Sequence, residues 1–359
     1  MVWSSWLASF QSWCAVSELR RSVRGLGFRA KAAVALVALV CLAGFGGSSK
    51  KGLVPIGAGL DGPAGAHATV YARGLPLVSA FAFDGRGRLW ATASGASTHT
   101  RDGVFLVRPG KAPVKAAYLR GPLGLVWVGK NLYVSTLAGV VELGGLQGTH
   151  FTSKKTILSG PSTGENNNLV RAPDGRLVLG ISAPCDHCRP ASKWAGAIVS
   201  FGLDGDGLRL YAGRIRAPYG LAFYPGTSDL YASMNQRDDL GSKTPGDWLA
   251  LVRPGESWGF PGCYGQGGSV CAGVPKPVGV LDPHAAAGGV AFLTSGGYAP
   301  SAVVPEWNRA KVMRVDLETR KVTPLLTGLD NPLPAVTTSG GALLIGDWGS
   351  GEIYRVVLP

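Results

Sequence analysis

The stretch AFAFDGRGRLWATAS, residues 80–94, reads as one antiparallel hairpin. Apolar residues alternate with others up to an Asp84-Gly85 turn, and a second apolar run begins at Leu89. Alternation on both sides of an Asp-Gly pair is typical of a β-hairpin. This part of the chain therefore predicts strands rather than helices.

The hairpin pattern recurs along the chain. It returns at residues 123–143, 168–182, 220–234, 289–298 running on to 311–317, and 334–356. A hairpin unit repeated every ~40–50 residues is typical of propeller blades, because one four-stranded sheet cannot bury both of its faces alone. We therefore predict an all-β fold, a six-bladed β-propeller over residues 70–359. Two β-sandwiches are the alternative, but the spacing continues where a linker between them would lie.

Composition supports this fold class. The 359 residues include 54 Gly and 24 Pro, which are too many for a mainly helical protein. The glycines have no three-residue period, which excludes collagen, and a hydrophobic content of 46% argues against disorder.

The N-terminal 51 residues read as a targeting segment. A basic stretch precedes AAVALVALVCLAGF at residues 32–45, and GGSSKKG follows it. This layout is that of a secretory signal, and the apolar run is shorter than the ~20 residues that span a membrane comfortably. We expect residues 1–51 to be a signal peptide, with an uncleaved membrane anchor as the alternative, and residues 52–69 to be a flexible lead-in. The protein is then exported, to the periplasm or the cell exterior.

The positive net charge does not indicate a nucleic-acid partner. Of the surplus of 13 positive charges, six lie in residues 1–51. The remainder carries no basic run interleaved with aromatic residues, so we expect no nucleic-acid binding.

Four cysteines lie beyond the targeting segment, in two local pairs. Cys185 and Cys188 stand in SAPCDHCRP, and Cys263 and Cys271 in GFPGCYGQGGSVCAG. In an exported chain, such pairs predict two loop disulfides. Zinc binding is the alternative, but the spacing matches no zinc finger or ribbon.

The loops of the third to fifth units carry a resemblance. The stretches PDGRLVLGISAPCDHC (173–188), RIRAPYGLAFYP (214–225), NQRDDLGSKTPGDWLALVRPGESWGFPGCYG (235–265) and DPHAAAGGVAF (282–292) together resemble the soluble glucose/sorbosone dehydrogenase family. Members of that family are six-bladed propellers that hold pyrroloquinoline quinone (PQQ) with calcium and oxidise sugars outside the cytoplasm. The resemblance implies the same cofactors, a sugar substrate and an electron acceptor.

The resemblance also implies site residues, since quinone carboxylates call for cations and calcium for oxygen ligands. It assigns cofactor contacts to Arg216, Asn235, Gln236 and Arg237, and metal contacts to Asp238 and Asp247. Two further groups have open interpretations. Trp258 and Phe260 either line a ligand or fix a turn, and His284 matches a family histidine or is structural.

The catalytic base is where the chain departs from the family. Family members supply a histidine from the loop before the third Pro-Asp-Gly turn, and that loop here, residues 159–175, contains none. Its one candidate is Glu165, which would need a raised pKa to act as a base near neutral pH. Three interpretations follow: a quinoprotein with Glu165 as base, an inactive propeller that binds a ligand, glycan or protein, and a calcium-dependent lactonase-type propeller.

Overall fold

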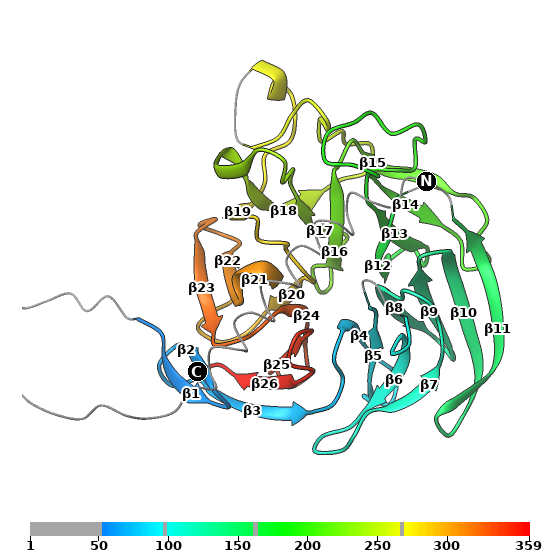
Figure 1. Ribbon diagram of the computed structural model, residues 1–359, viewed down its shortest axis with the longest axis vertical. Coiled ribbons are helices and arrows are strands. Elements are labelled where there is room, and N and C mark those ends of the chain that lie inside the picture. The colour runs from blue at the N-terminus through cyan, green and yellow to red at the C-terminus, as the bar shows by residue number, and fades with distance from the viewer. Residues whose placement is uncertain (1–51, 96–98, 161–163, 266–268) are drawn as a thin grey trace, which may run out of the picture. The chain divides into compact units, whose positions relative to one another are not determined.

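The computed structural model describes residues 52–359 except residues 96–98, 161–163 and 266–268. Residues 1–51, in which a signal peptide or anchor is expected, lie outside the described part. The described residues form six antiparallel sheets (Figure 1), which confirms the six-bladed β-propeller. None of their helices is long and apolar enough to cross a membrane.

Blades one to four each run from an inner to an outer strand. Blade one is β4 (Val78–Phe83), β5 (Leu89–Ala93), β6 (Gly103–Val107) and β7 (Val114–Ala117). Blade two is β8 (Gly124–Val128), β9 (Asn131–Thr136), β10 (Gly139–Gln147) and β11 (His150–Ser159). Blade three is β12 (Asn166–Arg171), β13 (Leu177–Ile181), β14 (Ala197–Phe201) and β15 (Arg209–Gly213). Blade four is β16 (Ala217–Phe223), β17 (Leu230–Asn235), β18 (Gly246–Val252) and β19 (Gly279–Pro283).

The last two blades use strands from both ends of the chain. Blade five is β20 (Ala291–Leu293), β21 (Ser301–Glu306), β22 (Lys311–Asp316) and β23 (Val322–Thr327), extended by β2 (Leu60–Gly62) and β1 (Val54–Gly57). Blade six is β24 (Pro332–Thr337), β25 (Leu343–Asp347) and β26 (Ile353–Val357), closed by β3 (His67–Ala72). Among the described residues, three short 3-10 helices lie in loops: η2 (Gly241–Lys243), η3 (Ser269–Cys271) and η4 (Trp307–Arg309).

The expected lead-in over residues 52–69 contributes strands instead. Strand β3 pairs with β26, which ties the start of the described chain to its end. Ile56 and Leu60 are buried in the same apolar cluster as Leu326 of blade five. The physical reason is that each outer blade edge has unpaired backbone groups, and this segment pairs with two such edges.

Six apolar clusters hold the blades together, and each joins two neighbouring blades. Trp90 of blade one packs with Leu132 of blade two, for example, and Val178 of blade three packs with Leu221 of blade four. The leucines that follow the predicted turns, Leu89, Leu132, Leu177, Leu230 and Leu343, are all buried. The repeated hairpin thus supplies the core because its apolar faces meet between blades.

One end of the propeller, here called the top face, is where each inner strand begins. Asn166 of β12 pairs with Ile181 of β13, and Ala217 of β16 pairs with Asn235 of β17. The starts of inner strands and the ends of second strands therefore share this face. The loops of blades three and four project from it.

A prediction concerns the two disulfides, Cys185–Cys188 and Cys263–Cys271, which both form as expected from the sequence. Replacing Cys263 and Cys271 by Ser should lower the free energy of unfolding by about 2–3 kcal/mol, because the cross-link closes a longer loop in the unfolded chain. Urea denaturation measures the loss. The matched Cys185/Cys188 double variant should lose less, and an equal or larger loss there would contradict the loop-length argument.

Candidate functional site

The start of blade three and the start of blade four are tied together at the top face. The amide of Ser182 donates to the carbonyl of Glu165 at 2.9 Å, and the amide of Ala183 donates to the carbonyl of Arg216 at 2.6 Å. Two consecutive residues after β13 therefore bind the backbone of Glu165 and of Arg216, which immediately precede the adjacent inner strands β12 and β16. The structure brings these two predicted residues into one region.

The Arg216 guanidinium is buried and paired with two carboxylates. Its Nη2 donates to Asp186, which stands between Cys185 and Cys188, and lies 3.4 Å from Asp238 Oδ2. Asp238 Oδ1 in turn lies 2.9 Å from Nδ1 of His284. The cation predicted to meet a cofactor is thus already charge-compensated by side chains of this chain.

Arg237 is paired as well. Its Nε and Nη2 donate to the two carboxylate oxygens of Asp239 at 2.6 and 2.7 Å, and its guanidinium stacks 4.6 Å from the centre of the Tyr264 ring. The hydrogen bond from Arg237 lowers the pKa of Asp239 below its ordinary value. Both predicted cofactor arginines therefore carry a carboxylate partner.

Asp247 is a buried acceptor at the end of the same loop. Its carboxylate accepts from the amides of Gln236 at 2.7 Å and Ala287 at 3.3 Å. Burial, with a smaller contribution from the charge of Asp238, raises its pKa to about 7.

The bonds of Asp247 are repeated by Asp102 in blade one, and Asp347 in blade six makes a related pair of bonds. Asp102 accepts from the amides of Gly95 and Gly121, and Asp347 accepts from those of Asp330 and Asn331. Asp102 and Asp247 each join the loop after a second strand to the segment that leads into the next blade, whereas Asp347, at the end of β25, binds the segment that leads into its own blade. Asp247 thus has a structural role in addition to its predicted metal contact.

Glu165 lies just before β12, at the top face. It is partly buried, and burial raises its pKa to about 7. Burial and the neighbouring charge of Glu165 both raise the pKa of Tyr219, which places the two side chains within electrostatic reach. A carboxyl that is half ionised at neutral pH suits proton transfer.

Three buried amide oxygens near these residues lack a donor within the described chain: Asn166 Oδ1, Asn167 Oδ1 and Asn235 Oδ1. Buried acceptors are normally paired. These three oxygens can therefore accept hydrogen bonds from ligand hydroxyls or coordinate a hard cation. The sequence assigned Asn235 to the site but missed Asn166 and Asn167. The signal that could have found them is the Asn-Asn-Asn run at residues 166–168, three consecutive amide side chains at the start of an inner strand.

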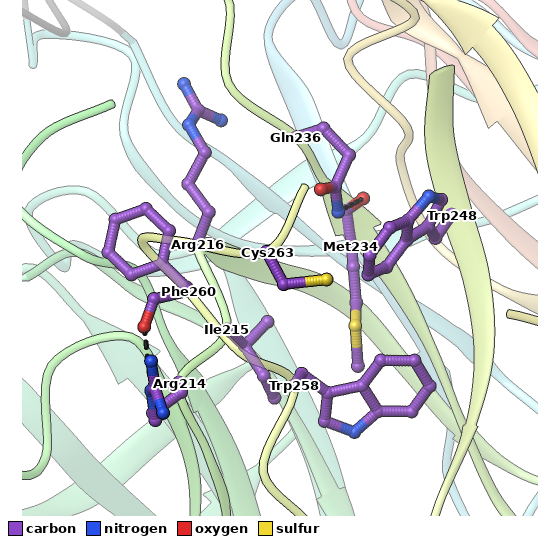
Figure 2. A pocket seen from close by; sticks show the side chains of 9 residues that line it. All are labelled: Arg214, Ile215, Arg216, Met234, Gln236, Trp248, Trp258, Phe260 and Cys263. Atoms are coloured by element: carbon purple, nitrogen blue, oxygen red, sulfur yellow. Dashed lines mark hydrogen bonds between the residues drawn. The ribbon is translucent and has the colours of Figure 1, made fainter. Parts of the chain in front are cut away.

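A small pocket opens between blades three and four (Figure 2). Its lining includes Arg216, Gln236, Trp258 and Phe260. Trp258 is buried and donates its amide to Gly213, so it fixes the turn while also lining the pocket. The turn interpretation is therefore supported, and contact of these aromatic residues with a ligand stays a prediction.

The residues at the top face match some requirements of calcium and PQQ and not others. Asp238 offers a carboxylate and Asn235 a buried oxygen without a donor, which is the all-oxygen chemistry that calcium takes. Within the described ranges, however, no group of three or more His, Cys, Asp or Glu side chains is arranged to hold a metal. PQQ fits only if its carboxylates replace those of Asp186 and Asp239 on the two arginines.

Comparisons with known proteins point to one kind of fold. No family model and no curated protein sequence matches this chain. The PQQ-bound aldose sugar dehydrogenase from Streptomyces coelicolor is similar with a TM-score of 0.65 and 17% identity, over 82% of this chain and 99% of that one. The apo soluble aldose sugar dehydrogenase from Escherichia coli has a TM-score of 0.64 at 18% identity, over 81% and 99%. The holo PQQ domain of Coprinopsis cinerea pyranose dehydrogenase has a TM-score of 0.69 at 14% identity, over 83% and 97%.

These neighbours confirm the resemblance stated from the sequence at the level of the fold. The chain is a six-bladed propeller of the kind that soluble PQQ-dependent sugar dehydrogenases use.

The raised carboxyl pKa values predict how stability depends on pH. Glu165 and Asp247 hold protons more tightly in the folded chain than in the unfolded chain, so the stability they contribute is lost as pH rises toward about 7. Urea unfolding should show a higher free energy at pH 5 than at pH 8, by about 2 kcal/mol for each carboxyl. Glu165→Gln should reduce this difference, and Asp239→Asn, whose carboxyl has a lowered pKa, should leave it unchanged. An undiminished difference in Glu165→Gln would show that Glu165 is ionised throughout.

Proposed function

We propose that this protein is a sugar dehydrogenase of the soluble quinoprotein type, which oxidises an aldose with PQQ and calcium outside the cytoplasm. The observation that carries the proposal is Glu165, a partly buried carboxyl with a pKa of about 7 just before β12, whose backbone is tied through Ser182 and Ala183 to that of Arg216. It supplies at the top face the proton acceptor that the missing histidine would otherwise provide.

Each group of residues has a separate role in the proposed reaction. Glu165 accepts the proton of a sugar hydroxyl as that hydroxyl is oxidised. The open amide oxygens of Asn166, Asn167 and Asn235 accept hydrogen bonds from other hydroxyls of the sugar. Arg216 and Arg237 would hold the cofactor carboxylates in exchange for Asp186 and Asp239, with Gln236 beside them. When bound, PQQ would supply the two-electron acceptor for this oxidation, with an external acceptor as the final oxidant.

The proposed location follows from the cysteines and the N-terminal sequence. Two disulfides in loops fit an oxidising compartment. A basic, then apolar, N-terminal segment fits a signal peptide or an anchor.

A second candidate function is ligand binding without oxidation. One observation favours it: Arg216 and Arg237, the cations that PQQ needs, are both bound to carboxylates of the chain itself. The open amide oxygens would then bind a hydroxylated ligand such as a glycan.

One experiment separates these functions. Purified protein is mixed with calcium and PQQ, then assayed for a bound-cofactor absorbance band and for dye reduction with a panel of aldoses. Cofactor-dependent dye reduction supports the dehydrogenase. Sugar binding by calorimetry without any cofactor uptake would overturn it in favour of the binding protein.

A further inference from the structure

A second pocket, here called the basic pocket, lies beside the one in Figure 2 and shares Arg214 and Phe260 with it. Its volume is about 400 Å³, within the range of small-molecule sites. Three of its lining residues are basic, Arg189, Lys193 and Arg214, and none of the described residues that line it is acidic. The pocket is therefore positively charged, whereas the charges of Arg216 and Arg237 are each balanced by a carboxylate.

Arg214 is held in place by neutral groups. Its Nε donates to the carbonyl of Phe260 at 3.0 Å and its Nη2 to that of Gly259 at 3.2 Å. Its backbone has a φ of 55°, a left-handed conformation that non-glycine residues adopt uncommonly. In Figure 2 its guanidinium points away from that of Arg216. These carbonyls fix the direction of the guanidinium and leave its charge uncompensated.

The other two cations lie on the disulfide loop. Arg189 and Lys193 follow Cys188, whose bond to Cys185 anchors that loop. Lys193 Nζ lies 4.4 Å from the centre of the Trp194 ring. Across the described ranges, neither cation nor Arg214 has a carboxylate within ion-pair distance, although such pairs occur at Arg216, Arg237 and Arg314.

We propose that the basic pocket binds the oxyanion, a carboxylate or a phosphate, of a small molecule. Arg and Lys charges that lack acidic partners are the groups that recognise such anions, and Arg214 presents a pre-oriented fork. The apolar side of the pocket, Leu210, Phe260 and Pro261, contacts the carbon skeleton of the same molecule. This site needs no quinone, so it stands whether or not the chain is a dehydrogenase.

The first test is calorimetry on the full chain without added cofactor. The probes are glucuronate, glucose 6-phosphate, glucose and inorganic phosphate. We expect at least one charged sugar to bind about tenfold or more tightly than glucose, and more tightly than inorganic phosphate. The tighter of the two charged sugars identifies the oxyanion as a carboxylate or a phosphate ester. The proposal would be overturned if glucose or inorganic phosphate bound as tightly as the charged sugars.

Matched variants locate the site. Arg214→Asn removes the charge at a position whose left-handed backbone Asn tolerates, and Arg320→Asn makes the same change at an exposed residue with a φ of 61° between β22 and β23. We expect Arg214→Asn to weaken binding of the charged sugar about tenfold and Arg320→Asn to leave it unchanged.

A second pair of variants covers the case in which Arg214→Asn does not fold. Lys193 is an exposed loop residue, and its substitution is Lys193→Gln. The control is Lys130→Gln, at an exposed residue between β8 and β9. Lys193→Gln should weaken binding and Lys130→Gln should not. Equal losses in a variant and its control would mean that only the overall charge matters, which would overturn the site.

Discussion

Glu165→Gln is expected to lower cofactor-dependent dye reduction by at least about 100-fold, the usual contribution of a general base, while PQQ uptake stays nearly unchanged. The reason is that Gln keeps the size of the side chain but has no proton affinity. Glu165 is the partly buried carboxyl with a pKa of about 7 at the start of blade three. The measurement is the dye-reduction rate beside the absorbance of the bound cofactor.

Two further readouts distinguish a base from a structural residue. The rate of the unmodified protein should rise with pH through about 7, because the carboxyl must be ionised to accept a proton. Glu165→His, which restores a base of pKa near 6.5, should recover part of the activity that Glu165→Gln loses. If Glu165→Gln reduces dye at the original rate, another group is the base and this part of the proposed function is wrong.

The fold was predictable because its information is local and repeated. Each hairpin carries its own alternation and its own turn, and Leu89, Leu177 and Leu343 mark equivalent buried positions in three blades. Each blade needs its neighbours to cover its apolar faces. A hairpin repeated at a regular spacing is therefore compatible with few folds.

The segment before the propeller was not predictable in the same way. Residues 54–62 are short and rich in Gly, and they become strands by pairing with β23, which lies far along the chain. Strand β3 likewise pairs with β26 at the opposite end of the sequence. Pairing of distant edges leaves no periodic signal within the segment itself.

The candidate site was predictable in its residues but not in their partners. The resemblance assigned Arg216 and Arg237, whereas nothing in the sequence indicated that Asp186 lies against Arg216. That contact joins two loops and depends on how the Cys185–Cys188 disulfide turns the chain. Ion pairs across loops follow from the fold, so they could be read only from the structure.

The Arg216–Asp186 pair yields the prediction that decides between the two candidate functions. If PQQ binds at Arg216, its carboxylate competes with Asp186 for the same guanidinium. Asp186→Asn removes the competing charge and should tighten PQQ binding about tenfold, which corresponds to 1.4 kcal/mol. Asp174→Asn, which removes a carboxylate 3.4 Å from exposed Arg209, is the matched control and should have no effect.

Arg216→Met should act in the opposite direction. It removes the buried cation, so PQQ binding should weaken by about tenfold or more, since a hydrogen bond to a charged group contributes about 1.5–3 kcal/mol. Stability should also fall, because Asp186 and Asp238 lose their shared partner. Absorbance titration with PQQ measures both affinities, and urea unfolding measures the stability. Opposite shifts in the two variants require that the cofactor uses Arg216. If neither variant changes PQQ binding, or no form of the protein binds PQQ, Arg216 serves only to hold the loops of blades three and four, and ligand binding without oxidation is the better account of this propeller.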